Sequence, residues 1–247
     1  MRSNRALAGV VRESCLRAGL PQASVQLVPS PDRALVSHLL KMREAIDLVV
    51  PRGGAELIRM VVREAAMPVI SGGIGVCHTY VDRRADLEKA TAVVYNAKVR
   101  RPTICNALDT LLVHREVAQD YLPRLAREWG KAGVEMRCDP QALKVLRAWE
   151  RKEGLSAPRL VPAAPGDWGY EFLALVAAVK VVSSLDEALE HIQRYGSGHS
   201  EAIVTEDYTA ARRFLAEVDA AAVYVNASTQ FTDGGQFGLG AEVGIST

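Results

Sequence analysis

The stretch AKVRRPTICNALDT, residues 97–110, holds the residue types best suited to nucleophilic chemistry. An apolar helical pattern ends there in a basic bend that contains a proline, and Cys105 stands just before the next apolar run. Positive charge beside a thiol favours the thiolate, which is the reactive form, and three basic residues lie close in sequence: Lys98, Arg100 and Arg101. The competing interpretation of Cys105 is a small buried hydrophobe, the usual role of a free cysteine.

A second candidate site is a glycine pair between a strand and a helix. The β-branched run 46–51 predicts a strand, Arg52, Gly53 and Gly54 follow it, and the apolar spacing over 55–66 predicts a helix. Glycines at a helix amino terminus let an anion approach free backbone N–H groups, so this turn suits a phosphate. Two glycines also occur in ordinary tight turns, and both interpretations stay open.

The loop 71–75, SerGlyGlyIleGly, is rich in glycine but does not match the dinucleotide-binding fingerprint. The strand predicted after it, 76–81, carries Cys77 and His78 on opposite faces. We interpret His78 as a buried or rim residue with a satisfied side chain rather than as a catalyst. The glycine-rich segment 226–240 suits a loop that wraps a small polar ligand, or simply a flexible tail.

Composition excludes several classes of protein. The chain has 247 residues, 49% of them hydrophobic, which is enough for one large or two small packed domains. Its formal net charge of +1 argues against nucleic-acid binding. No amino-terminal signal pattern and no apolar run long enough for a membrane span is present, so we expect a soluble cytoplasmic protein. Four widely spaced cysteines predict neither a zinc site nor a disulfide framework, and no metal is expected.

The elements that must hold these residues alternate between strand and helix along most of the chain, which is typical of an α/β fold with a parallel sheet. The stretch 130–168 is broken by glycine and proline, and only one helix is predicted in it. Predicted helices cover 5–18, 31–42, 55–66, 82–97, a long segment through 121–129, 141–151, 186–194 and 207–217. Predicted strands cover 23–28, 46–51, 67–70, 76–81, 110–114, 176–182, 201–205 and 221–226.

Four segments together resemble the γ-glutamyl phosphate reductase family, also called glutamate-5-semialdehyde dehydrogenase, a branch of the aldehyde dehydrogenase superfamily. They read IDLVVPRGGAELIR, NAKVRRPTICNALDTLLVH, LDEALEHIQRYGSGHSEAIVT and VYVNASTQFTDGGQFGLGAEVGIST. The similarity runs from about Ser3 to Thr247, and the motifs are long and keep their order. The resemblance implies an aldehyde dehydrogenase-like fold, with a partial Rossmann-type dinucleotide-binding domain over 1–75 and an α/β catalytic domain over 76–247.

The resemblance also implies a reaction. Members of this family reduce L-glutamyl 5-phosphate with NADPH to glutamate 5-semialdehyde and phosphate, the second step of proline biosynthesis. By position, Cys105 would be the nucleophile that forms a thioester, and backbone N–H groups near Cys105 and Asn106 would hold the oxyanion. Arg52, Gly53 and Gly54 would receive the cofactor pyrophosphate, and Glu171 would contact the nicotinamide ribose.

The substrate's glutamyl part would face the loop 226–240, with His199 nearby. The contact residues implied there are His199, Asn226, Thr229 and Phe231. The chain departs from the family pattern at Gln230, where arginine is usual, and at Gln236, where an acid is usual. Between Glu64 and Asp82 there is no acid that could activate a hydrolytic water, and this absence favours a reductase over an aldehyde oxidiser.

Family members are longer than this chain at both ends. We expect the absent amino-terminal part to leave an unpaired, apolar strand edge, and the absent tail to affect oligomer contacts. Two functions stay open: an NADP-dependent reductase, and a non-catalytic fragment that acts at most as an oligomerising domain. The implied partners are a small-molecule substrate, further copies of the chain and glutamate 5-kinase, with no nucleic acid and no membrane.

Overall fold

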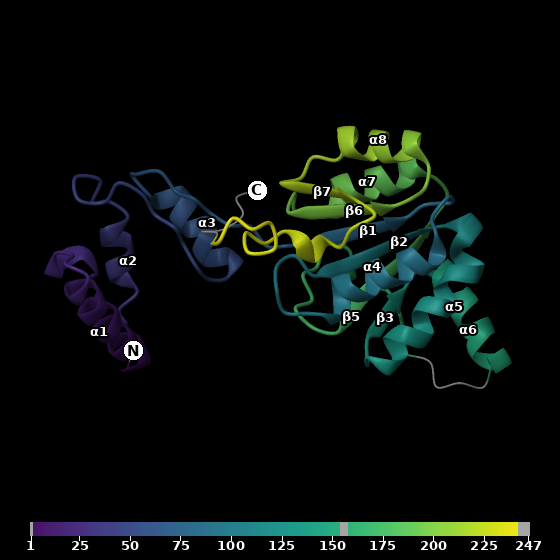
Figure 1. Cartoon of the computed structure of the whole chain (residues 1–247), viewed down its shortest axis with the longest axis horizontal. Helices are drawn as coiled ribbons and strands as arrows, with labels where there is room; N and C mark the ends of the chain where they lie inside the picture. The colour runs from purple at the N-terminus through teal and green to yellow at the C-terminus, as the bar shows by residue number, and fades with distance from the viewer. Residues whose placement is uncertain (1, 154–157, 242–247) are drawn as a thin grey trace. The chain divides into compact units, whose positions relative to one another are not determined.

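A computed structural model describes residues 2–153 and 158–241 of the chain (Figure 1). Two compact units share these residues. The first contains residues 1–50 and 59–69, and the second contains residues 51–58 and 70–247. Each unit is described by itself. Among the helices of the described residues, none combines the length and the apolar content that a membrane span requires.

The first unit is helical and buries few side chains. It contains α1 (Arg2–Arg17), η1 (Gln22–Ser24), α2 (Ala34–Leu39) and most of α3 (Ala55–Glu64). Helix α1 buries none of its residues, and the unit's buried apolar side chains are those of Leu40, Val61 and Met67. A single parallel bridge joins Val49 and Val69.

The strands predicted over 23–28, 46–51 and 67–70 are therefore wrong. The structure has no strand over 23–28, and the other two ranges contribute only the bridge between Val49 and Val69. Two short strands side by side are marginal in water, because a strand is stabilised by ladders on neighbouring strands and by a covered face. Within the described residues these ranges have no further strands beside them, so their apolar alternation does not produce a sheet.

The second unit is built on a seven-stranded parallel sheet, ordered β4-β3-β5-β2-β1-β6-β7. The α/β prediction is confirmed. The strands, in chain order, are β1 (Cys77–Val81), β2 (Leu108–His114), β3 (Glu135–Cys138), β4 (Leu160–Pro162), β5 (Val176–Val182), β6 (Ser200–Val204) and β7 (Ala222–Val225). β1 and β2, which flank the Cys105 bend, lie at the centre of the sheet, and every residue of both is buried. This is the arrangement expected of parallel strands covered on both faces.

Helices cover both faces of this sheet (Figure 1). On one face α4 (Leu87–Val99), α5 (Arg115–Lys131) and α6 (Pro140–Glu153) pack over a large apolar cluster centred on Leu111, Tyr121 and Trp129. On the other face α7 (Leu185–Tyr195) and α8 (Tyr208–Glu217) enclose a smaller cluster around Tyr80 and Phe214. Short turns η2 (Pro165–Asp167) and η3 (Thr229–Phe231) complete the unit.

Helix starts follow the capping chemistry of the sequence. The side chain of Ser184 accepts from the N–H of Glu187 at the start of α7, as the sequence predicts. Helix α4 begins later than the predicted residue 82, because Asp86 is the residue whose carboxylate accepts from the first free N–H groups, those of Glu88 and Lys89.

Candidate active site

Cys105 lies in the bend between α4 and β2, within the second unit. Its side chain is exposed, and it forms no disulfide. The turn is closed by a hydrogen bond from the Ala107 N–H to the Ile104 carbonyl at 3.0 Å. The Cys105 carbonyl accepts from the buried Cys77 thiol at the start of β1, with Sγ 3.3 Å from the oxygen. The thiol of Cys105 is therefore exposed, while the Cys105 backbone contacts β1 of the sheet.

Gly75 supports the same bend from the neighbouring loop. A β-carbon added to Gly75 would lie 1.7 Å from the Cys105 carbonyl oxygen and 2.8 Å from the Cys105 Cα. No side chain fits in that space, since all the nearest atoms belong to backbone. The loop 71–75 does not match the dinucleotide-binding fingerprint. In the structure, its last residue packs against the backbone of Cys105.

Glu171 is brought to this loop from a distant part of the chain. Its Oε1 accepts from the Gly75 N–H at 3.0 Å. Glu171 therefore lies beside the backbone that contacts Cys105, where the sequence placed a cofactor contact. The next residue, Phe172, donates its N–H to Asp109 Oδ1 at 3.0 Å. Glu171 and Phe172 thus connect one segment to both the Gly75 loop and Asp109.

Asn106 is held by the segment that follows β7. Its Nδ2 donates to the Thr232 carbonyl at 2.9 Å, and its own carbonyl accepts from Thr229 Oγ1 at 2.7 Å. Gln230, between these two partners, is buried and donates from Nε2 to the carbonyls of Ala97 at 2.9 Å and Arg101 at 3.3 Å. The neutral amide of Gln230 thus connects α4, at Ala97, with the basic segment that follows it, at Arg101.

A series of polar side chains extends from Cys77, whose thiol contacts the Cys105 carbonyl. His199 Nδ1 is 2.9 Å from Ser200 Oγ and 3.9 Å from Cys77 Sγ. Ser200 Oγ is 2.7 Å from Thr232 Oγ1, which is 2.9 Å from the Tyr224 hydroxyl. Burial lowers the pKa of His199 and raises that of the Cys77 thiol, so both are neutral at pH 7.

Lys98 and Asp109 form a buried ion pair under the bend, with Nζ 3.7 Å from Oδ1 and both side chains almost fully buried. Burial lowers the pKa of Lys98 to about 8 and raises the pKa of Asp109 to about 6. The sequence assigned the charge of Lys98 to the Cys105 thiolate. In the structure its ammonium donates to the Leu108 carbonyl at 2.8 Å and is paired with Asp109, and its effect on the Cys105 thiolate stays a prediction.

The glycine pair precedes a helix, as predicted. Helix α3 begins at Ala55, and a β-carbon on Gly54 would meet no atom within 4 Å. A ligand can therefore approach the Gly54 backbone, whereas a β-carbon on Gly53 would meet the side chain of Leu57. An open backbone at a helix amino terminus fits the pyrophosphate of a dinucleotide. Arg52 precedes the pair, and its place in a cofactor site stays a prediction.

Three predicted substrate residues differ in their surroundings. Asn226 has a positive φ of 56° and uses its whole amide on Thr205: Oδ1 accepts from the Thr205 N–H at 3.0 Å, and Nδ2 donates to its carbonyl at 2.9 Å. Phe231 is 44% exposed and free to meet a ligand's apolar part. Thr229 is fully buried and is bonded to Asn106. Roles of all three in substrate binding stay predictions.

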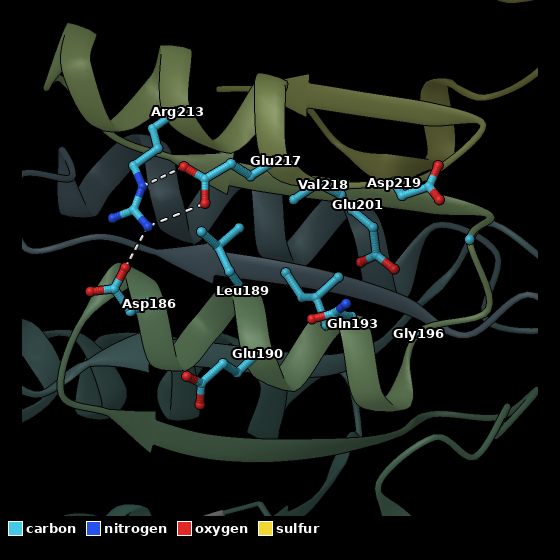
Figure 2. A pocket seen from close by; sticks show the side chains of 12 residues that line it. Asp186, Leu189, Glu190, Gln193, Gly196, Glu201, Arg213, Glu217, Val218 and Asp219 are labelled. Atoms are coloured by element: carbon cyan, nitrogen blue, oxygen red, sulfur yellow. Dashed lines mark hydrogen bonds and ion pairs between the residues drawn. The ribbon is translucent and has the colours of Figure 1, made fainter.

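A hollow lies between α7 and α8, and Cys105 is not among the residues that line it (Figure 2). Its acidic side chains include Glu201, which accepts the His78 N–H at 2.7 Å. Arg213 reaches across the hollow to Asp186 and also binds Glu217 of its own helix. Among the described residues, no group of His, Cys, Asp or Glu side chains could hold a metal ion.

Three site residues escaped the sequence interpretation: Gly75, Asp109 and Thr232. The glycine-rich loop was a visible signal for Gly75, but nothing local indicates which backbone it approaches. Asp109 lies inside an apolar run, where a lone acid signals a buried partner. No signal in the sequence reveals that the Thr232 carbonyl accepts from Asn106, because the two residues are 126 positions apart.

Comparison with known proteins finds a family whose sequence model matches this chain. A sequence model of the aldehyde dehydrogenase family matches residues 4–143 and 168–241. A γ-glutamyl phosphate reductase of Dehalococcoides mccartyi is 60% identical over 99% of this chain and 56% of its own length. The corresponding protein of Aquifex aeolicus is 51% identical with the same coverage.

A solved structure agrees with these sequences. The crystal structure of γ-glutamyl phosphate reductase from Thermotoga maritima superposes with a TM-score of 0.89 at 47% identity. It covers 99% of this chain and 56% of the other. The chain thus spans about half the length of the relatives that it matches.

Proposed function

Because the chain belongs to the aldehyde dehydrogenase family, we propose that it carries the nucleophilic half of an NADPH-dependent reduction of L-glutamyl 5-phosphate. The observation that carries the proposal is the exposed thiol of Cys105, seated on Gly75 and Cys77 and flanked by a fixed Asn106. The names of its relatives supply the substrate and, with it, a place in proline biosynthesis.

The first step uses the residues of the bend. The Cys105 thiolate attacks the acyl carbon, the carbonyl oxygen gains negative charge, and the C–O bond to phosphate breaks to leave a thioester on Cys105. Backbone N–H groups of the bend near Cys105 and Asn106 stabilise the oxyanion. Because Asn106 is tied to Thr229 and Thr232, the bend keeps its shape as charge develops.

The dinucleotide would be held by Gly53 and Gly54 at the start of α3, after Arg52, and by Glu171 at the ribose. NADPH supplies, when bound, the hydride that takes the thioester to the oxidation level of the aldehyde. Glu171 already lies at the loop that contacts Cys105, with its Oε1 bonded to the Gly75 N–H. The stretch between Glu64 and Asp82 holds no acid that could activate a hydrolytic water, and this supports a reductase over an aldehyde oxidiser. Association into a homo-oligomer and contact with glutamate 5-kinase stay predictions.

The reverse reaction tests the proposal. Purified protein is mixed with glutamate semialdehyde, phosphate and NADP⁺, and phosphate-dependent formation of NADPH is followed at 340 nm. We expect activity in the wild type and in Cys138→Ser, a buried thiol far from the bend in sequence, and none in Cys105→Ser. Equal activity in Cys105→Ser and the wild type would overturn the proposal. A folded wild type that neither reacts nor binds NADPH would favour the non-catalytic alternative.

A further inference from the structure

The two ends of the Cys105 bend are joined by a buried ion pair. Lys98 is in the last turn of α4 and Asp109 is the second residue of β2, so the pair brackets the bend. Lys98 Nζ donates to the Leu108 carbonyl at 2.8 Å and lies 3.7 Å from Asp109 Oδ1. The side chains are 0% and 2% exposed, so solvent does not compete for these contacts. The pair thus fixes where the bend begins and where it ends.

Asp109 also holds a second segment. Its Oδ1 accepts from the Phe172 N–H at 3.0 Å. The Phe172 ring lies 5.9 Å from Lys98 Nζ and 5.1 Å from the Arg137 guanidinium carbon, so cations of two elements contact it. Leu173, the next residue, has a φ of 49°, a strained conformation for a residue with a branched side chain. The hydrogen bond of Phe172 to Asp109 and the two cation contacts of its ring hold the backbone next to this strained residue.

The segment then closes a ring of contacts on the nucleophile. Glu171, beside Phe172, accepts from the Gly75 N–H at 3.0 Å. Gly75 contacts the backbone of Cys105, and Cys105 belongs to the bend that Lys98 and Asp109 bracket. The Asp109 carboxylate is therefore linked to the bend by its ion pair with Lys98, and to the Gly75 loop by the hydrogen bonds of Phe172 and Glu171.

We propose that Asp109 is a positioning residue for the proposed reaction: with Lys98 it fixes the bend of Cys105, and through Phe172 and Glu171 it fixes the loop of Gly75. A buried ion pair is a poor choice for stability alone, because apolar residues of similar volume are often as stable or more so. Its directional hydrogen bonds, by contrast, set the position of two backbones at once. The activity readout below rests on the proposed function, and the exchange readout does not.

The first experiment is hydrogen exchange followed by mass spectrometry on the full chain. Lys98→Met/Asp109→Leu replaces the pair by apolar side chains, so no unpaired charge is left buried. We expect backbone exchange to accelerate about tenfold or more in three segments, 71–77, 99–107 and 168–173, with α5 and α7 unchanged. Lys180→Met is the matched control, because it removes a partly buried ion pair with Glu187 elsewhere in the same unit.

A milder variant covers the case in which the double variant does not fold. Asp109→Asn keeps an oxygen for the Phe172 N–H but loses the attraction to Lys98. We expect faster exchange in 99–107 and unchanged exchange in 168–173. Unchanged exchange in 99–107 for both variants, or acceleration spread evenly over the whole sheet, would overturn the positioning role.

The second experiment measures kcat and KM in the reverse reaction. We expect the double variant to lower kcat about 10- to 100-fold and to change KM for the semialdehyde less than about threefold, since misplaced reacting groups cost rate more than binding. A double variant as active as Lys180→Met would contradict the proposal. An inactive wild type would count against the proposed function alone, because hydrogen exchange still decides the role of Asp109.

Discussion

Gly75 approaches Cys105 so closely that a β-carbon on Gly75 would lie 1.7 Å from the Cys105 carbonyl oxygen. The contact is between two backbones, so neither side can yield by turning a side chain. It means that the position of the thiol is set from outside the bend, by a loop whose last residue comes 30 residues earlier in the chain. Glycine at this position is a steric requirement rather than a source of flexibility.

Gly75→Ala is therefore expected to displace the bend. Overpacking of this kind typically costs about 1–3 kcal/mol of unfolding free energy, and the displaced thiol should lose most of its activity. Urea denaturation and phosphate-dependent NADPH formation measure the two effects. Gly166→Ala is the control, because a β-carbon there meets no atom within 4 Å. Equal activity of the two variants would show that the bend tolerates the displacement.

Stability should fall with rising pH because of Asp109. Burial raises the pKa of Asp109 to about 6 in the folded protein, against about 4 in the unfolded chain. The protonated acid therefore favours the folded state, and this contribution is lost as pH rises from about 4 to about 6. Two pKa units correspond to about 3 kcal/mol.

Asp109→Asn removes this titration. The unfolding free energy of the wild type minus that of the variant should thus decrease by up to about 3 kcal/mol between pH 4 and pH 7. Urea denaturation at several pH values measures it, and other acids cancel in the difference. A difference that is constant, or that grows with pH, would contradict the raised pKa.

Asn226 gives a test of backbone strain. Asn226→Gly loses two hydrogen bonds to Thr205 but suits the positive φ, whereas Asn226→Ala loses the same bonds and carries a β-carbon in that conformation. We expect both variants to be destabilised, with alanine worse than glycine by about 1 kcal/mol. Thermal and urea unfolding provide the comparison. An alanine variant as stable as the glycine variant would mean that the turn relaxes.

Alkylation should distinguish the cysteines. Cys105 is exposed, while Cys77 and Cys138 are buried, and burial raises the pKa of Cys138 to about 12. A thiol with that pKa is ionised to a fraction of only about 10⁻⁵ at pH 7. Iodoacetamide followed by peptide mass mapping should modify Cys105 long before these two, and all should react in urea. Early modification of Cys138 would place it at the surface.

Sequence patterns predicted the elements whose stability is largely local. The runs that became β2, β5 and α7 have strong apolar periodicity, and Ser184 marked a helix start correctly. They failed where a strand depends on its neighbours. β3 and β4 are short and mixed in composition, and they exist because β5 pairs with β3, which pairs with β4. The range 23–28 alternates well but has no such partner among the described residues.

The same division applies to the candidate site. Cys105 could be proposed from its surroundings in the sequence, since a bend, a thiol and basic residues are adjacent, whereas Asn106 was implied by the family resemblance alone. The bond between Glu171 and Gly75 joins residues 96 positions apart, and no spacing rule predicts it. The ion pair of Lys98 with Asp109 was not predicted either, because sequence distance to Cys105 says nothing about a buried carboxylate on the next strand.

The strand order has a consequence for synthesis on the ribosome. β1, which begins beside the loop of Gly75, pairs with β6, and the His78 N–H finds its acceptor on Glu201, 123 residues later. At 5–20 residues per second, translation needs roughly 6–25 s to cover that distance. For that interval β1 lacks the strand that pairs with one of its edges. The sheet that carries the Cys105 bend is therefore completed only after β6 and β7 have been synthesised.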